Sequence, residues 1–167
     1  MGCLGAHFAL DDRSMRKLRS FKSKQELLDY FIDEVEEDYF NTQSEWLAET
    51  DKSWDAIHRS LTDGQFGWNN GTYPLNHVIM GGERMYDGDD YILVLKTPHQ
   101  IRDVATALAP LTRKQLRQGY SLINTENCDW EPSEEDFEYV WSFFPPLQQF
   151  FARAAAAERF VVFSADQ

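Results

Sequence analysis

The sequence predicts a single α+β domain in which several helices pack on a small mixed sheet. Its 167 residues match the usual size of one domain. Three short apolar runs, at 3–10, 91–95 and 159–163, indicate strands, and amphipathic segments between them indicate helices. Since no linker, internal repeat or low-complexity segment interrupts the chain, we expect one domain over residues 1–167.

The N-terminal segment begins with a predicted buried strand. Residues 3–10 are apolar and uncharged, and Asp11 and Asp12 end the run. Residues 13–24 contain six basic groups and no acid, which is compatible with a short helix. This basic segment is expected to be a solvated face that pairs with the acids that follow it.

A long amphipathic helix is predicted from Ser23 to about Phe40. Ser23 and Glu26 have the spacing of a capping box. Apolar residues then recur at helical spacing: Leu27, Leu28, Phe31, Ile32, Val35 and Tyr39. The outer face is acidic: Glu26, Asp29, Asp33, Glu34, Glu36, Glu37 and Asp38. Because like charges at this density weaken a helix, a basic partner would relieve their repulsion.

A second helix and an aromatic loop follow. Asp51 is a candidate N-cap for a helix with one apolar side: Trp54, Ile57, His58 and Leu61. Gly64 suits the left-handed position that closes it. Residues 64–73 form a predicted loop rich in Gly, Asn and aromatic residues. Pro74 begins a short helix that Gly81 and Gly82 close.

The C-terminal half alternates a strand with helices. Residues 83–90 are a polar turn before the clearest strand, 91–95. Pro98 suits the first position of a helix that Pro110 stops, and Thr112 caps another.

The last helical segment carries two adjacent prolines. Ser133 is a candidate cap for it. Pro145 and Pro146 are expected to break or kink the helix. A further helix is then predicted from about Leu147 to Glu158.

The charge balance favours a basic protein as partner. Acidic residues number 28 and basic residues 16, a net charge of −12. Phosphate backbones and anionic membranes would repel such a chain, so we expect neither nucleic acid nor membrane as partner. Opposite charge speeds encounter with a basic protein. Alternatively, the acidity serves only solubility.

The two cysteines and the N-terminus favour the cytoplasm. Cys3 and Cys128 have neither disulfide-framework nor zinc-site spacing. The sequence shows no secretory signal and no apolar run long enough to span a membrane.

Acidic and aromatic residues form the predicted partner-binding face. Trp and Tyr are favoured interface anchors. The predicted residues are Asp33, Glu34, Glu36, Glu37, Trp68, Tyr73, Asp87, Asp89, Trp130, Glu131 and Glu134. The turn 87–90 could bind calcium, but it lacks EF-hand spacing, which favours an exposed acidic turn. We therefore expect no metal and no cofactor.

Catalytic motifs are absent from the sequence. It contains no Gly-rich phosphate loop, serine nucleophile elbow or zinc motif, so we expect a binding protein and not an enzyme. The alternative is an enzyme of unknown reaction, with a site where Asp55, His58 and Trp68 converge.

The chain resembles the bacterial YfbM-like family, a family of unknown function. The likeness spans most of the chain and is carried by Met1-Gly2 with Gly5, the stretch 51–55, Leu61-Thr62, Pro74-Leu75 with Ile79 and Gly81, and the later strand leading to Pro98 and the 108–120 helices. The resemblance implies an α+β fold of about this length and no established activity. Relatives that lie beside toxin genes would suit an immunity protein, which binds and blocks a toxin domain with a basic active-site face.

Overall fold

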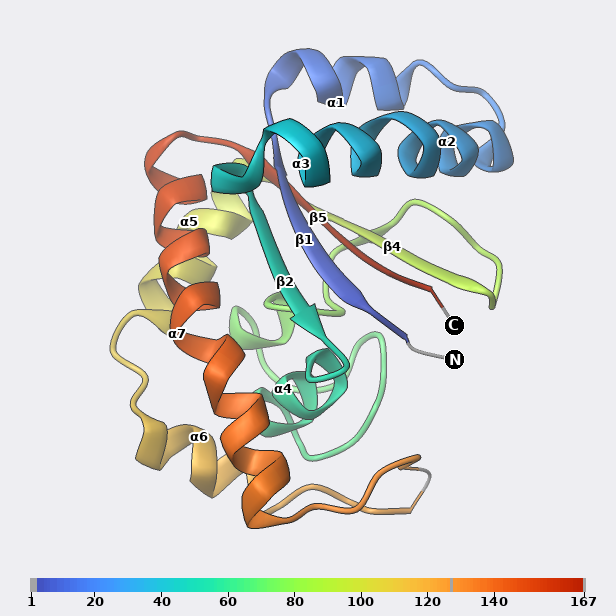
Figure 1. The fold of residues 1–167 in the computed structure, drawn as a ribbon. Helices are drawn as coiled ribbons and strands as arrows, with labels where there is room; N and C mark the ends of the chain where they lie inside the picture. Colours follow the sequence, from blue (N-terminus) through green and yellow to red (C-terminus); the bar gives the residue numbers. More distant parts are fainter. Residues whose placement is uncertain (1–2, 127, 167) are drawn as a thin grey trace.

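The computed structural model describes residues 3–126 and 128–166, which form a five-stranded sheet flanked by helices (Figure 1). The strand order is β2-β1-β5-β4-β3. The strands are β1 (Gly5–Leu10), β2 (Leu47–Asp51), β3 (Glu83–Arg84), β4 (Tyr91–Lys96) and β5 (Phe160–Asp166). The α+β class is confirmed. All neighbouring strands are antiparallel, where a mixed sheet was expected, because the helices link antiparallel strands and make no parallel crossover.

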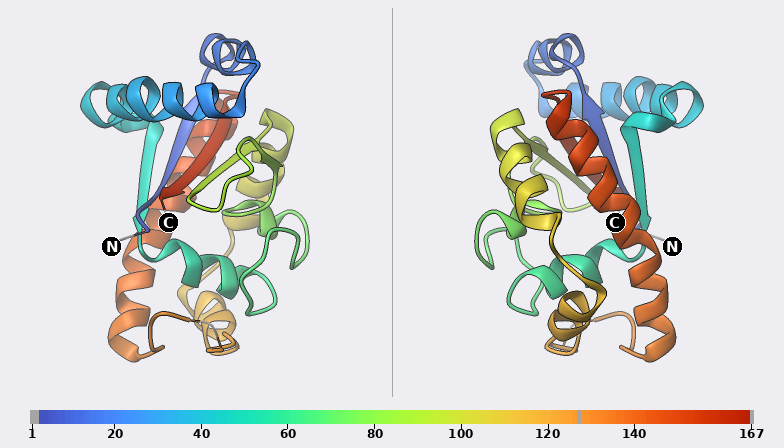
Figure 2. Two further views of the ribbon diagram at one scale, coloured as in Figure 1. Left: turned by 90° about the vertical axis from the view of Figure 1, so that its right-hand side faces the viewer. Right: turned by 90° about the vertical axis from the view of Figure 1, so that its left-hand side faces the viewer.

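Alternate residues of the central strands separate two apolar cores. Successive strand residues point to opposite faces of a sheet. Phe8 and Val162 pack with the N-terminal helices on one face. His7 and Phe163 point to the other face, where α4 (Trp54–Leu61), α5 (Pro98–Leu108), α6 (Arg113–Tyr120) and α7 (Glu134–Ala156) pack. Figures 1 and 2 show the N-terminal helices gathered at one end of the sheet and α7 running along its other face.

The N-terminal helices have side-chain caps. The Asp11 carboxylate accepts from the Ser14 backbone N–H at 2.8 Å and begins α1 (Asp12–Arg19). Ser23 caps α2 (Lys24–Tyr30), which continues through a π-helical turn, η1 (Phe31–Glu36), into α3 (Glu37–Thr42). The long predicted helix is therefore confirmed in extent, but its middle turn is wider than an α turn. Ile32, expected to face inward, is 37% exposed.

The short strand β2 was not predicted, and it changes the role of Asp51. A 3-10 turn, η2 (Ser44–Trp46), leads into β2, and Asp51 ends the strand with a positive φ of 46°. Ser53 then precedes α4 (Trp54–Leu61). The prediction that Asp51 caps this helix is wrong, because Asp51 lies in the strand and turns the chain.

A glycine ends α4, and an irregular loop follows it. Gly64 has φ of 83° and its N–H reaches the Arg59 carbonyl at 3.1 Å, so it closes α4 as predicted. Residues 64–73 contain no helix or strand. The segment after Pro74 forms η3 (Leu75–His77), and β3 occupies two residues of the predicted turn 83–90.

Three helices of the C-terminal half begin at side-chain caps, of which Thr112 and Ser133 were predicted, and Pro98 takes the predicted first position of its helix. Thr97 and Thr112 form capping boxes for α5 (Pro98–Leu108) and α6 (Arg113–Tyr120). Ser133 caps α7 (Glu134–Ala156), which runs through both prolines as one helix of 23 residues.

The predicted break at Pro145 is therefore wrong. The lost backbone hydrogen bonds are offset by burial of side chains on both sides of the prolines, Phe144, Leu147, Phe150 and Phe151. Among the described residues, no helix has both the length and the apolarity to cross a lipid bilayer.

Candidate functional site

A groove of about 580 Å³ lies where β1, β2 and β5 meet the π-helical turn. Its volume is in the range of ligand-binding pockets. We call it the Glu36 groove. Its lining residues are Leu4, Gly5, Ala6, Ile32, Glu36, Phe40, Glu49, Asp51, Tyr91, Phe143, Ser164 and Asp166.

Three backbone irregularities meet at this groove. The π turn carries Ile32 and Glu36. The pairing of β1 with β2 shifts register between Gly5 and Ala6. Asp51 has left-handed geometry, which is strained for a residue with a side chain. π turns, bulges and strained residues are each enriched at functional sites, so their coincidence here marks the groove as a candidate site.

The bulged end of β1 is packed under an aromatic ring. A Cβ atom on Gly5 would lie 2.6 Å from Trp54 Cδ1, so only glycine fits beneath this ring. The Trp54 indole N–H donates to the Cys3 carbonyl at 2.9 Å. This contact fixes the start of β1 at the edge of the groove.

Glu36 is the most constrained carboxyl of the groove. Its Oε1 accepts hydrogen bonds from the Tyr91 hydroxyl and, at 2.7 Å, from the Ser164 hydroxyl. Burial raises the pKa of Glu36 above its usual range, and the two hydroxyl donors oppose that shift. No described residue donates to Oε2, the second oxygen. Glu36 therefore presents one free carboxylate oxygen to the groove.

The other carboxylates make the groove strongly acidic. Asp166 Oδ1 accepts from the Leu4 backbone N–H at 3.0 Å, which leaves its second oxygen free of described partners. Glu49 and Asp51 complete a set of four carboxylates, and none of the described lining residues is Lys, Arg or His. Leu4 and Phe40 add exposed apolar surface, at 55% and 47% exposure. The groove thus combines negative charge with apolar walls, which suits a cation with an apolar stem.

Two smaller pockets lie beside α4. They measure about 330 and 420 Å³ and share Asp55 and Asp129. Arg59 is 4% exposed, and its Nε donates to Asp55 at 2.7 Å while its guanidinium reaches the Asn124 carbonyl at 3.3 Å. This network fastens the loop before α7 to α4 and leaves the Asp55 charge neutralised.

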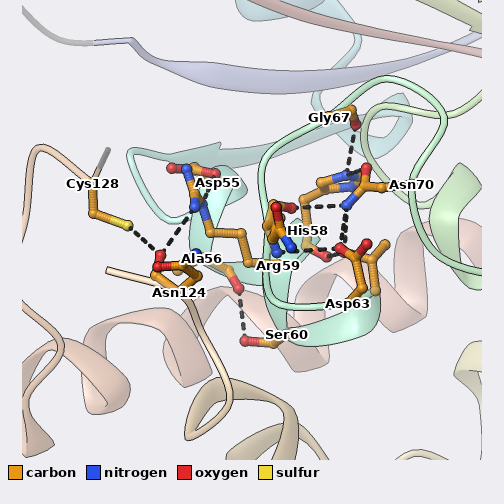
Figure 3. Close-up of polar contacts among 12 residues, drawn as sticks. Asp55, Ala56, His58, Arg59, Ser60, Asp63, Gly67, Asn70, Asn124 and Cys128 are labelled. Atoms are coloured by element: carbon orange, nitrogen blue, oxygen red, sulfur yellow. Dashed lines mark hydrogen bonds and ion pairs between the residues drawn. The ribbon is translucent and has the colours of Figure 1, made fainter. Parts of the chain in front are cut away.

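The residues of the enzyme alternative do not meet in one pocket. His58 Nε2 lies 3.0 Å from both the Gly67 carbonyl and the Asn70 side-chain oxygen, and burial lowers its pKa (Figure 3). Trp68 instead lies under the Arg84 guanidinium, 3.9 Å from the ring centroid. Neither His58 nor Trp68 lines the two pockets that contain Asp55. His58 serves to hold the 64–73 loop, as expected of a core histidine.

The predicted acidic and aromatic residues lie in separate parts of the surface. Asp33, Glu34 and Glu37 are exposed on the helix that includes the π turn, next to the groove that Glu36 lines. The start of α7, with Glu134, and the loop before it, which contains Trp130 and Glu131, lie at the opposite end of the molecule (Figures 1 and 2).

The loop residues of the predicted face have internal partners. Trp68 is half-buried, and the Tyr73 hydroxyl donates to Asp103 at 2.5 Å. Asp87 pairs with Lys24 at 2.5 Å, so the basic segment binds this turn, whereas it was expected to pair with the acids just after it. Asp89 is exposed. Of the predicted face, Glu36 alone lines the groove.

Several groove residues carried no functional signal in the sequence. Leu4, Ser164 and Asp166 come from the two chain ends that the sheet brings together. Ile32 belongs to the predicted inner stripe of the helix, and only knowledge of the π turn would place it at the groove. Among the described residues, no cluster of three or more His, Cys, Asp or Glu is arranged to hold a metal ion.

Comparison with known proteins places the chain in a family. No curated protein matches it. The crystal structure of YfbM from Escherichia coli, a protein of unknown function, matches with a TM-score of 0.66 at 18% identity, covering 97% of this chain and 99% of that chain. This likeness shows a shared fold. The profile of DUF1877, a domain of unknown function, matches residues 1–164. The resemblance to a YfbM-like family is thereby confirmed, and the chain belongs to the DUF1877 family.

Proposed function

We propose that the chain is an acidic protein-binding domain that captures a basic partner at the Glu36 groove. More specifically, we propose that the chain is an immunity protein, which binds a bacterial toxin and covers the basic active-site face of that toxin. The observation that carries the proposal is the composition of the groove, with four carboxylates, exposed apolar side chains and no basic residue among its described lining.

The surface beside the groove supports capture of a basic protein. Asp33, Glu34 and Glu37 are exposed, and none of them takes part in an ion pair among the described residues. Their field adds to the net charge of −12. Such a field raises the rate of encounter with a basic protein, while apolar contacts in the groove slow dissociation.

The proposal is tested with the product of the gene adjacent to this one. Both proteins are purified, and the affinity is measured calorimetrically at low and at physiological salt. We expect binding that weakens as salt screens the charges. In cells, co-expression of the chain should restore growth that the neighbouring gene product inhibits. Absence of binding together with absence of growth rescue contradicts the proposal.

A matched pair of double variants locates the interaction. Glu36→Gln with Asp166→Asn removes two charges inside the groove, and Asp89→Asn with Glu135→Gln removes two exposed charges outside it. We expect the groove variant to lose about tenfold or more in affinity and the control variant to change it by less than about threefold. Equal losses would mean that net charge, and not the groove, carries binding.

A further inference from the structure

We propose that the Glu36 groove is a lysine-specific docking site, which receives one lysine side chain from the partner protein between its carboxylates and its apolar wall. This inference rests on the proposed function and names the chemical group by which the partner is anchored.

Two carboxylates of the groove, Glu36 and Asp166, are arranged to receive a cation. Glu36 and Asp166 each have one oxygen fixed by a donor of the protein itself and a second oxygen without a described partner. Tyr91 and Ser164 hold the Glu36 carboxyl in place, so little side-chain freedom is lost when a cation arrives. The burial that raises the pKa of Glu36 also reduces the screening of its charge by water.

The number of free oxygens distinguishes lysine from arginine. Arginine binds carboxylates most strongly as a fork, with two parallel N–H groups on the two oxygens of one carboxylate. Glu36 cannot accept such a fork, because Oε1 already accepts from Tyr91 and Ser164. Asp166 Oδ1 accepts one hydrogen bond, from Leu4, and keeps a second lone pair, so this restriction rests on Glu36. A lysine ammonium is a compact charge with three donors, and it can contact single oxygens from two carboxylates at once.

The walls of the groove favour a lysine that belongs to a protein over a free amine. Ile32, Phe40 and Phe143 line the groove as apolar side chains, against which the four methylenes of lysine can pack. Leu4, 55% exposed, extends apolar surface beyond the charged centre. A free diamine has no flanking residues to cover this surface, whereas a peptide segment with apolar neighbours does.

The test uses the whole chain and four probes, followed by amide chemical shifts in NMR titrations. The probes are the acetylated and amidated tripeptide Leu-Lys-Leu, its arginine and norleucine analogues, and cadaverine, a free diamine. We expect the lysine peptide to shift amide resonances within 32–40, 47–51 and 164–166. The arginine peptide should bind at least about threefold more weakly and the norleucine peptide at least about tenfold more weakly.

An exposed acid outside the groove provides the control. Glu36→Gln should weaken binding of the lysine peptide about tenfold, and Glu135→Gln, an exposed acid of α7 that does not line the groove, should leave its affinity unchanged. A glutamine can still accept from Tyr91 and Ser164 through its oxygen. Thermal melting verifies that the variant is folded, and Asp166→Asn, whose oxygen can still accept from Leu4, is an independent second variant.

Three results would overturn the inference. Equal affinity for the lysine and arginine peptides refutes the selectivity. An equal effect of Glu36→Gln and Glu135→Gln refutes the role of the groove. Cadaverine binding as tightly as the peptide reveals a small-amine site. Failure of the proposed function alone is distinguishable from failure of this inference. In that case the neighbouring gene product does not bind the chain, whereas the lysine peptide still does.

Discussion

The ionisable groups on the two faces of the sheet differ in their access to water. On the face covered by α4 to α7, His7 and Lys96 are 0% exposed. The Lys96 ammonium nitrogen donates to the Ile79 carbonyl, and burial lowers its pKa well below its ordinary value. Burial and nearby Lys96 lower the pKa of His7 to about 3. On the other face, Glu36 is half-buried and lines an open groove.

This difference shows which face is available for binding. On the closed face, water is excluded and burial disfavours the charged forms of the two basic groups, so they belong to the packing. On the open face, Glu36 retains access to solvent although its pKa is raised. The same strands supply both environments, since Phe163 and Ser164 are neighbours in sequence but point to opposite faces. The open face is therefore the one whose ionisable groups are accessible to a partner.

The largest effect should come from truncating the closed face. Phe163 is fully buried, and its ring centroid lies 4.8 Å from that of His7 and 5.7 Å from that of Trp54. Phe163→Ala should lower the free energy of unfolding by about 3–5 kcal/mol. Phe40→Ala, at the groove, should lower it by less than about 1 kcal/mol. Urea denaturation measures both, and similar losses would contradict the comparison of the two faces.

Replacing the buried lysine should stabilise the protein and remove a pH dependence. The unfolded chain protonates Lys96 with an ordinary pKa of 10.5, whereas burial lowers this pKa well below that value in the folded chain. Between the two pKa values, unfolding therefore takes up a proton. Between the folded and unfolded pKa values, stability should rise with pH by about 1.4 kcal/mol per unit and fall as pH falls. Lys96→Met should be more stable at pH 7 and lack this slope.

Denaturation at pH 7, 8 and 9 measures the effect of Lys96. Lys22→Met, an exposed lysine, is the matched control and should retain the slope of the natural protein. A slope unchanged in Lys96→Met would mean that Lys96 is charged in the folded state.

A smaller effect is expected for binding at the open face. Protonation of Glu36 removes the charge that holds the lysine probe, and its pKa is raised. The affinity of the Leu-Lys-Leu peptide should therefore fall as pH is lowered from 7 towards 5, and it should fall less in Glu36→Gln. Asp166, Glu49 and Asp51 face the same groove in both proteins, so the difference isolates Glu36. Identical pH profiles would exclude this role.

The smallest effect should come from the exposed ion pair between Lys24 and Asp87. Its two side chains are 53% and 68% exposed, so water and salt screen the attraction. Lys24→Gln should leave the melting temperature unchanged within error. A clear drop would show that the basic segment organises the turn before β4.

Most elements could be predicted because local rules decide them. The Thr112 cap, the helix start at Pro98, the closing Gly64 and the apolar run of β4 follow from short-range chemistry, and each is confirmed. The predictions were wrong where tertiary contacts override the local preference of the sequence. The proline pair lies within α7 because buried aromatic side chains hold both halves of the helix.

The groove could be predicted only in part. Glu36 was recognised as an acidic surface residue, but its partners Tyr91 and Ser164 come from strands 55 and 128 residues away. The register that joins them depends on pairing between β4 and β5, which no local pattern specifies. The Asp51 turn and the bulge at Gly5 likewise depend on β2, a strand whose five residues have no strong apolar alternation.

The π turn also bears on how the chain tolerates changes in length. A π turn contains one residue more than the α turn it replaces. Loss of one residue between Phe31 and Glu36 could restore α geometry there while Leu28 and Tyr39 keep their places in the core. The same loss within α2 would rotate the following buried side chains by about 100° relative to the sheet. The chain should thus tolerate insertions and deletions best at the wall of the groove. Under the proposed function, such changes would let the groove adapt when the partner protein changes.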